Sequence, residues 1–326
     1  MIVPDFWAEA RKHHRDGKKQ FTVRRFGWSN VSQSEALAMA ESRVADALAR
    51  LIAGEKIDRR ERKATYNGAF GVPIREEVLS RHGEEVVTRN SYGAHCLNTP
   101  RALFADIDFD PQRSGKDALI AFAVMAAGCT LVGLQLHRWG LVFGLLVISL
   151  FLSASTAAVL RRMITALRGG PNQLARQRVI AFLAEHPSWN LRLYKTPNGI
   201  RLLVTHQPYE SNDPEVKRFF AAVGTDPIYA RMCANQRCFR ARLTAKPWRI
   251  GIPDHMRPRP GIWPVNPARR NLREHWVAQY EQRAAGFAAC HFVESLGSGT
   301  VHQDLLQVIE LHDRESRATQ PAFILA

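Results

Sequence analysis

Residues 118–136 read ALIAFAVMAAGCTLVGLQL and residues 139–160 read WGLVFGLLVISLFLSASTAAVL. Each run reaches the roughly 20 apolar residues that a membrane-crossing helix needs. Gln135 is the only strongly polar residue of the first run, and the second run carries no charge. The two residues between the runs leave room only for a turn, so the sequence predicts a transmembrane helical hairpin. A buried helical hairpin of a large soluble domain is the alternative, but it would show a polar stripe that these runs lack.

Basic residues flank both open ends of this hairpin. They are Arg113 and Lys116 before the first run, and Arg161, Arg162 and Arg168 after the second. The turn carries only Arg138 and the titratable His137. Because cytoplasmic segments are enriched in Lys and Arg, both arms should be cytoplasmic. The N-terminal MIVPDFWAEARKHH has no apolar signal region. We therefore expect a multi-pass protein of the inner (cytoplasmic) membrane with both termini cytoplasmic.

Composition restricts the kinds of partner and of fold. The chain has 326 residues, 46% of them hydrophobic, and a formal net charge of +15, with a pI near 10.2. This charge favours anionic partners: nucleic acid, nucleotide phosphates or an anionic membrane face. A charged fraction of 23% with 9% aromatic residues excludes a disordered or collagen-like chain. Five cysteines in no regular framework argue against a disulfide-stapled secreted domain.

The rest of the chain predicts an α+β domain that the hairpin interrupts. We divide the chain into an N-terminal part at 1–117, the hairpin at 118–160, the rest of the cytoplasmic domain at 161–252, and a Pro-rich loop with C-terminal helices at 253–326. The first and third segments should share one sheet. The residues that could bind metal or phosphate together with the acidic strand at 103–109 all follow the hairpin in the sequence. The hairpin is then an insertion that holds one domain at the bilayer.

Local signals predict the elements of this domain. Strands are expected at 20–27, 64–70, 77–92 and 103–109, with a two-stranded hairpin at 189–206 around Pro197, Asn198 and Gly199. Helices are expected from the capping box Ser32/Glu35 to Ala53, and at 173–185, 213–223, 268–289 and 301–316. His13 and His14, beside Lys18 and Lys19, are interpreted as a solvated basic helix end.

Asp106 and Asp108 share one face of the strand expected at 103–109. Two carboxylates this close repel each other unless a cation lies between them, and their hard oxygens suit Mg²⁺ or Mn²⁺. Two metal ions bridged by carboxylates are a common device for nucleotidyl transfer. Most Asp-x-Asp pairs are solvated strand ends, but apolar residues on both sides place this pair on a buried strand. Asp106 and Asp108 are therefore candidate catalytic and metal-binding residues.

Two further segments offer cations for phosphate. Arg201, in the hairpin at 189–206, could hold a phosphate with both of its outer nitrogens, although an ordinary surface arginine is the simpler alternative. Arg240, Arg242 and Lys246 should lie close together on a strand and its following loop. They form a candidate anion-binding surface, with a basic face against anionic lipid as the competing interpretation.

The order of these elements resembles the archaeo-eukaryotic primase superfamily, which includes the primase-polymerases. An Asp-x-Asp strand is followed by a hairpin with a Gly-x-basic step, a lone Asp226, and an Arg-x-Arg…Lys strand and loop. The resemblance covers about residues 100–110 and 190–250. It implies an RRM-like, primase-type catalytic sheet and two-metal nucleotidyl transfer. It also implies that Asp106, Asp108 and Asp226 hold the metals, and that Arg240, Arg242 and Lys246 face nucleotide phosphates or template.

The chain departs from this family in two places. Arg201 stands two residues after Gly199, where the family usually has a histidine that contacts the incoming nucleotide. His206, a further candidate nucleotide-binding or phosphate-binding residue, follows five residues later. The transmembrane hairpin between the first two motifs is also unusual for the family. Both departures indicate a specialised or repurposed member.

Three functions remain open on the sequence. The first is a membrane-anchored, two-metal nucleotidyltransferase acting on nucleotides or nucleic acid. The second is a non-catalytic membrane protein that uses the same scaffold to bind nucleic acid or nucleotide, which Arg201 in place of histidine favours. The third is a metal-dependent glycosyltransferase, weakened because no nucleotide-binding βαβ unit precedes the acidic strand. Separately, His95, Cys96, Cys233 and Cys238 could form a zinc site, although buried thiols are the ordinary interpretation.

Overall fold

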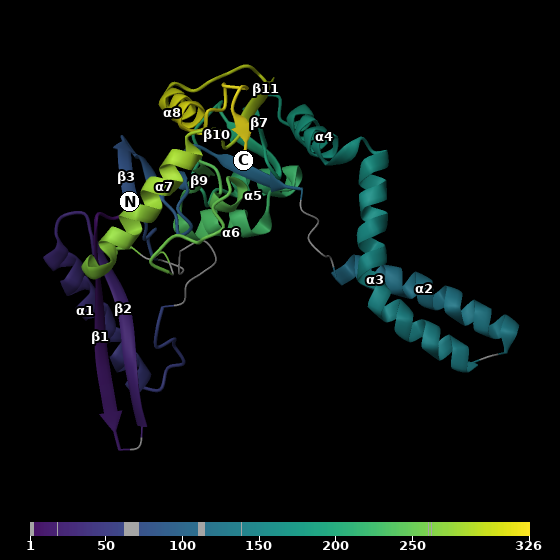
Figure 1. Ribbon diagram of the computed structural model, residues 1–326, viewed down its shortest axis with the longest axis horizontal. Coiled ribbons are helices and arrows are strands. Elements are labelled where there is room, and N and C mark those ends of the chain that lie inside the picture. The colour runs from purple at the N-terminus through teal and green to yellow at the C-terminus, as the bar shows by residue number, and fades with distance from the viewer. Residues whose placement is uncertain are drawn as a thin grey trace. The chain divides into compact units, whose positions relative to one another are not determined.

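The computed structural model describes residues 3–17, 19–61, 72–109, 115–137, 139–259, 261 and 263–326. The chain divides into two compact units (Figure 1). The α+β unit comprises Met1–Ile107 and Phe182–Ala326, and the helical unit comprises Asp108–Ala181. The expected α+β class is confirmed: the described residues contain eight α-helices and several sheets. The strand expected at 64–70 lies outside the described residues, as do Asp110, Arg113 and Arg138.

The elements follow one another along the chain as shown in Figure 1. The strands are β1 (Phe6–Asp16), β2 (Lys19–Ser29), β3 (Glu77–His82), β4 (Glu85–Arg89), β5 (His95–Thr99), β6 (Phe104–Asp108), β7 (Asn190–Thr196), β8 (Gly199–Val204), β9 (Phe239–Arg242), β10 (Phe287–Ala288), β11 (His291–Gly297) and β12 (Ile324–Leu325). The helices are α1 (Gln33–Ile52), α2 (Gly115–Leu136), α3 (Trp139–Leu167), α4 (Gly170–Glu185), α5 (Pro214–Val223), α6 (Pro227–Gln236), α7 (Arg270–Ala284) and α8 (Leu306–Ser316).

Two four-stranded sheets form the centre of the α+β unit. Their strand orders are β11-β7-β8-β6 and β3-β4-β5-β9. Strand β5, which precedes the apolar segment, pairs antiparallel with β9, which follows it. Strand β6 likewise lies beside β8. Strands from both sides of the apolar segment therefore share sheets, so this segment is an insertion into the α+β unit.

Apolar side chains and one tyrosine hold these sheets together. Every residue of β8 is buried, as expected of a strand covered on both faces. The Tyr229 hydroxyl on α6 lies 3.1 Å from the Phe104 carbonyl oxygen of β6 and 2.9 Å from the Arg240 carbonyl oxygen of β9. This hydroxyl therefore lies within hydrogen-bond distance of main-chain carbonyl oxygens from both sheets.

Helix α1 packs on the ribbon formed by β1 and β2. Its N-terminus is capped as expected, since Ser32 Oγ accepts a hydrogen bond from the Glu35 amide at 3.2 Å. Helix and ribbon approach so closely that a Cβ on Gly27 would lie 2.2 Å from the Ala36 carbonyl oxygen. The interpretation of His13 and His14 as a helix end is wrong, because both lie in β1. Strand pairing along the whole ribbon outweighs the local charge pattern there.

The helical unit contains two helices long enough and apolar enough to cross a membrane, α2 and α3. They approach closely at Gly133, where a Cβ would lie 2.2 Å from Val142 Cγ2. The open ends of the two helices are joined by an ion pair between Asp117 and Arg161. Large apolar side chains such as Phe143 and Phe151 are exposed within the described residues, which is the surface that a lipid-facing helix presents.

Most other expected elements agree with the structure. The hairpin expected at 189–206 is formed by β7 and β8, and the expected helices at 173–185 and 213–223 correspond to α4 and α5. The helix expected at 268–289 ends at Ala284, and β10 follows it. Here β10 pairs in parallel with β12, so a long-range strand contact ends the helix earlier than its local sequence predicts.

Candidate functional site

Asp106 and Arg201 form an ion pair at the centre of the α+β unit. Asp106 comes from β6 and Arg201 from the neighbouring strand β8. Arg201 Nε donates to Asp106 Oδ1 at 2.8 Å and Nη2 donates to Oδ2 at 3.2 Å. The Arg201 side chain is 3% exposed and that of Asp106 30%. Both carboxylate oxygens are therefore held by one buried guanidinium.

The remaining nitrogen of this guanidinium connects further elements. Arg201 Nη1 donates to the Arg242 carbonyl oxygen at 2.9 Å and lies 3.4 Å from His312 Nε2. Burial alone lowers the pKa of Arg201, but the charge and hydrogen bonds of Asp106 more than offset it, so the pKa is raised. Arg201 thus remains charged and serves as an internal counter-ion between β6, β8, β9 and α8.

Asp226 lies next to this pair through its main chain. The Asp226 amide donates to the Asp106 carbonyl oxygen at 2.9 Å. The Asp226 carboxylate caps α6 by accepting from the Ile228 amide at 3.1 Å. Asp108 is exposed at the end of β6, where the helical unit begins. The sequence therefore identified two residues that are neighbours in the fold, Asp106 and Asp226.

Arg201 would compete with a metal ion for the carboxylate of Asp106. A metal ion binds carboxylate oxygens directly, but both oxygens of Asp106 accept hydrogen bonds from Arg201. The part of the chain that the structure describes contains no group of three or more His, Cys, Asp or Glu side chains arranged to hold a metal.

A second layer of buried polar residues lies behind Arg201. His312 Nδ1 lies 3.0 Å from Asp313 Oδ1, and Arg192 Nη2 lies 2.5 Å from Asp313 Oδ2. Burial raises the pKa of Asp313, but the hydrogen bond with His312 and the charge of Arg192 outweigh it, so the pKa is lowered. The contacts run from Asp106 to Arg201, His312, Asp313 and Arg192. Along this series each carboxylate is balanced by a guanidinium, so the charges compensate one another inside the fold.

Cys290 is the nucleophilic side chain of this layer. Its Sγ lies 3.8 Å from His312 Nε2 and 3.4 Å from Ser316 Oγ. Burial raises the pKa of the Cys290 thiol, while His312 and Arg201 lower it, and the net pKa is below the ordinary value. The thiol of Cys290 contacts the imidazole of His312, which in turn contacts the carboxylate of Asp313. This is the arrangement found around a cysteine nucleophile. Cys290 and His312 are both 0% exposed, so no substrate reaches this thiol in the structure.

The predicted basic surface is not one patch. Arg240 is buried and pairs with Glu76, with Nη2 2.6 Å from Oε2. Arg242 Nη1 donates to the Thr244 carbonyl oxygen at 2.7 Å. The Lys246 ammonium lies 5.5 Å from the centre of the Trp248 ring. Of these cations, Arg240 is part of the interior rather than of a surface that nucleic acid can reach.

His206 lies just beyond β8 in an aromatic cluster. Its Nδ1 accepts from the Asn190 amide at 3.3 Å, and Nε2 lies 3.0 Å from the Tyr209 hydroxyl. The Trp189 ring packs 4.7 Å from the imidazole. Burial lowers the pKa of His206, and both of its ring nitrogens are engaged.

The possible zinc ligands do not assemble. Burial raises the pKa of the Cys238 thiol to about 12, and it also raises the pKa values of Cys96 and Cys233. His95 Nε2 lies 2.8 Å from Glu281 Oε1. All three cysteines are buried, in agreement with the ordinary interpretation, and the described residues contain no group of three or more metal-ligating side chains.

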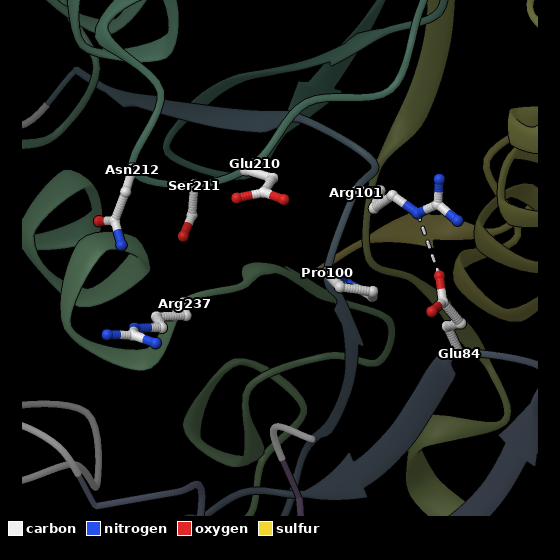
Figure 2. A pocket seen from close by; sticks show the side chains of 7 residues that line it. All are labelled: Glu84, Pro100, Arg101, Glu210, Ser211, Asn212 and Arg237. Carbon is white, nitrogen blue, oxygen red and sulfur yellow. Dashed lines mark hydrogen bonds and ion pairs between the residues drawn. The ribbon is translucent and has the colours of Figure 1, made fainter.

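A cavity of about 450 Å³ opens on the α+β unit, and neither Asp106 nor Arg201 lines it. It is lined by Glu84, Pro100, Arg101, Glu210, Ser211, Asn212 and Arg237. Figure 2 shows the pair Glu84–Arg101, whose charged atoms lie 3.1 Å apart, on one side and Arg237 on the other. Because both charges line it, the cavity suits a zwitterionic or neutral polar molecule better than a simple anion. None of the candidate residues from the sequence lines this cavity.

Sequence reasoning missed the layer formed by Arg192, Cys290, His312 and Asp313. The adjacent His312 and Asp313 are the only local signal, and such pairs are common on helix surfaces. The chain matches no protein-family model, no curated protein and no solved structure.

Proposed function

We propose that this chain is a membrane-anchored protein whose α+β unit binds nucleic acid and does not catalyse nucleotidyl transfer. The observation that carries the proposal is the hydrogen bonding of Arg201 to both oxygens of Asp106. Two-metal nucleotidyl transfer requires such oxygens to bind cations directly. In this chain a fixed cation of the protein takes that position, so the carboxylate supports the fold instead of a metal.

The energetics of the ion pair support the same conclusion. Arg201 is 2% exposed. Separating a buried pair leaves an uncompensated charge, at a cost of about 3–5 kcal/mol. A metal ion that displaces Arg201 from Asp106 would lose that binding free energy, which weakens its binding by roughly two to four orders of magnitude.

The apolar helices and the net charge support the remaining parts of the proposal. Helices α2 and α3 supply a two-helix anchor, and the basic residues at their open ends favour a cytoplasmic position for both arms. The formal net charge of +15 favours a polyanionic partner. We therefore propose a location in the inner membrane with both termini cytoplasmic.

The second candidate function is the primase-like nucleotidyltransferase. The hydrogen bond between the main chains of Asp226 and Asp106 favours it, because it brings two candidate metal ligands together. Catalysis would require Arg201 to release Asp106 when metal and nucleotide bind.

The two functions are separated by one preparation of the full chain in phosphatidylcholine nanodiscs. With Mg²⁺ or Mn²⁺, a labelled primer–template and nucleotides, we expect binding that weakens with salt and no extension of the primer. Extension that Asp106→Asn and Asp108→Asn both abolish would establish the enzyme instead. Failure to bind any nucleic acid at 50 mM salt would contradict the proposed function.

A further inference from the structure

Strands β1 and β2 form a long ribbon, the β1–β2 arm (residues 6–29). Their antiparallel pairing runs without interruption from Phe6↔Ser29 to Asp16↔Lys19, and Figure 1 shows the two strands side by side. Eleven paired residues span about 34 Å at the usual rise of a strand. Near its base the arm buries Trp7, Ala10 and Val23.

In the outer half of the arm, consecutive side chains of β1 are exposed. Arg11, Lys12 and His13 are consecutive and all exposed. Because successive side chains of a strand point to opposite faces, this run presents exposed side chains on both faces of β1, although Val23, the partner of Lys12 on β2, is buried. A contact of 5.2 Å between the His14 and Phe21 rings and a hydrogen bond of 3.1 Å from His13 to Thr22 join the two strands here. These cross-strand contacts order the outer half, together with Arg59, whose guanidinium lies 5.0 Å from the centre of the Phe21 ring.

This outer half is strongly basic. Residues 11–15 read RKHHR, three permanent cations and two imidazoles with no acid. Glu9 pairs with Arg11 and lies 3.5 Å from Arg24. For Lys12 and Arg15 the described part of the chain provides no ion-pair partner. An exposed cation without an ion-pair partner loses little free energy when it binds a phosphate, because no existing ion pair must break.

We propose that the β1–β2 arm binds double-stranded DNA by entering its major groove. This inference rests on the proposed nucleic-acid binding and names its surface and partner. The major groove of B-DNA, about 12 Å wide, admits a two-stranded β-ribbon. The deep, narrow major groove of A-form RNA does not admit side chains. The cations of the arm contact the phosphates on the two walls of the groove, so binding depends on salt and little on sequence.

The positions of the two unpaired cations favour a groove over a lipid surface. Lys12 and Arg15 are three residues apart on β1, so their side chains leave opposite faces of the ribbon. A flat anionic membrane reaches one face at a time and engages only one of them. A groove has phosphates on both sides of the ribbon and engages both.

Fluorescence anisotropy tests this inference with the full chain in phosphatidylcholine nanodiscs and a labelled duplex of about 30 base pairs, across KCl concentrations. The test variant is Lys12→Gln/Arg15→Gln. If both cations contact phosphate, the plot of log Kobs against log[KCl] becomes shallower in the variant, its negative slope shrinking in magnitude by about 1.8. The affinity at 0.1 M salt then falls roughly 60-fold. The charge-preserving variant Lys12→Arg/Arg15→Lys keeps the wild-type slope.

The matched control is Arg269→Gln/Arg270→Gln, which removes the same charge from exposed residues at the start of α7. It should change the slope little. An equal loss in the control and the test variant would show a general charge effect and overturn the arm inference, while the proposed function would stand. Equal binding of single-stranded DNA, or arm-dependent binding to phosphatidylglycerol vesicles with none to duplex, would also overturn it. Absence of all nucleic-acid binding would contradict the proposed function itself.

Discussion

At the residue scale, the guanidinium of Arg201 connects the two central sheets of the α+β unit. It bonds to the side chain of Asp106 on β6 and to the main chain of Arg242 on β9. These strands belong to different sheets, so one side chain connects both sheets. A buried cation in this position is tolerated only while its counter-ion remains.

Removing the counter-ion should therefore destabilise the protein. We expect Asp106→Ala to lower the free energy of unfolding by about 3 kcal/mol, because it leaves the buried charge of Arg201 unpaired. The double variant Asp106→Ala/Arg201→Leu should lose less than the two single variants combined. Urea unfolding in detergent, followed by tryptophan fluorescence, measures each value.

An exposed ion pair provides the control for this cycle. Glu84 and Arg101 are 63% and 51% exposed at the side chain, and Glu84→Ala should cost less than about 1 kcal/mol. Additive losses in the Asp106/Arg201 cycle would show that the two side chains stabilise the fold independently, against our interpretation.

Asp313 should make stability depend on pH in the acid range. Its pKa is lower in the folded chain, through His312 and Arg192, than in the unfolded chain. The stability that it contributes is complete above the ordinary aspartate pKa of about 3.9, and it is lost as the pH falls through the lower, folded pKa. Asp313→Asn should therefore be less stable at pH 7 and lose less stability than wild type between pH 5 and pH 2.

Denaturant midpoints at a series of pH values measure this difference. Asp46→Asn, on the exposed surface of α1, serves as the control and should follow the wild-type profile. A profile of Asp313→Asn parallel to wild type would show that Asp313 does not contribute to acid unfolding.

At the element scale, α2 and α3 pack through one close contact. Gly133 of α2 meets Val142 of α3, and Cys129 Sγ lies 3.7 Å from Ser149 Oγ further along the same interface. Small residues allow apolar helices to approach each other this closely. Close packing matters in a membrane, because the hydrophobic effect does not drive helices together there. The packing of the hairpin therefore depends on the volume of the side chain at position 133.

A crosslink between the helices tests this contact. In the variant Ser149→Cys, oxidation should join Cys129 to the new cysteine in high yield. Adding Gly133→Leu should reduce the yield several-fold, because the new side chain overlaps Val142. Mass spectrometry of digested protein measures the yield. Gly144→Leu is the control, since a Cβ there meets nothing within 4 Å; equal yields in the two leucine variants would contradict the packing.

At the scale of the whole molecule, an apolar segment is inserted into a domain whose strands come from both sides of it. The pairing of β5 with β9 requires residues 96–99 and 239–242 to meet. Both arms of the chain must then lie on the same side of any membrane that α2 and α3 cross. The ion pair of Asp117 with Arg161 agrees with this arrangement, because it joins the two open ends of the hairpin.

Cysteine labelling tests this orientation in intact cells. We expect His137→Cys, at the turn, to react with a membrane-impermeant maleimide added from outside. Asp46→Cys, on exposed α1, should react only after the membrane is permeabilised. The unsubstituted chain measures the background, because Cys96, Cys233, Cys238 and Cys290 are buried. Labelling of both positions from outside would contradict the proposed topology.

The sequence by itself determined the features that depend on local patterns. The apolar runs are continuous, so α2 and α3 follow from length and composition alone. The capping box at Ser32, the turn around Gly199 and the buried strand with Asp106 are also local signals, and the structure contains each of them.

Only the tertiary structure decided what the polar residues do. Asp106 and Arg201 are 95 residues apart, and Arg201 and His312 are 111 apart. No short-range pattern encodes such pairings, because they arise when strands and helices from distant parts of the chain pack together. The same limit explains why Arg240 lies against Glu76 and not at a surface, and why His13 and His14 lie in β1 and not at a helix end. Charge and spacing indicate which side chains are able to bind an ion, and packing determines which ion each one meets.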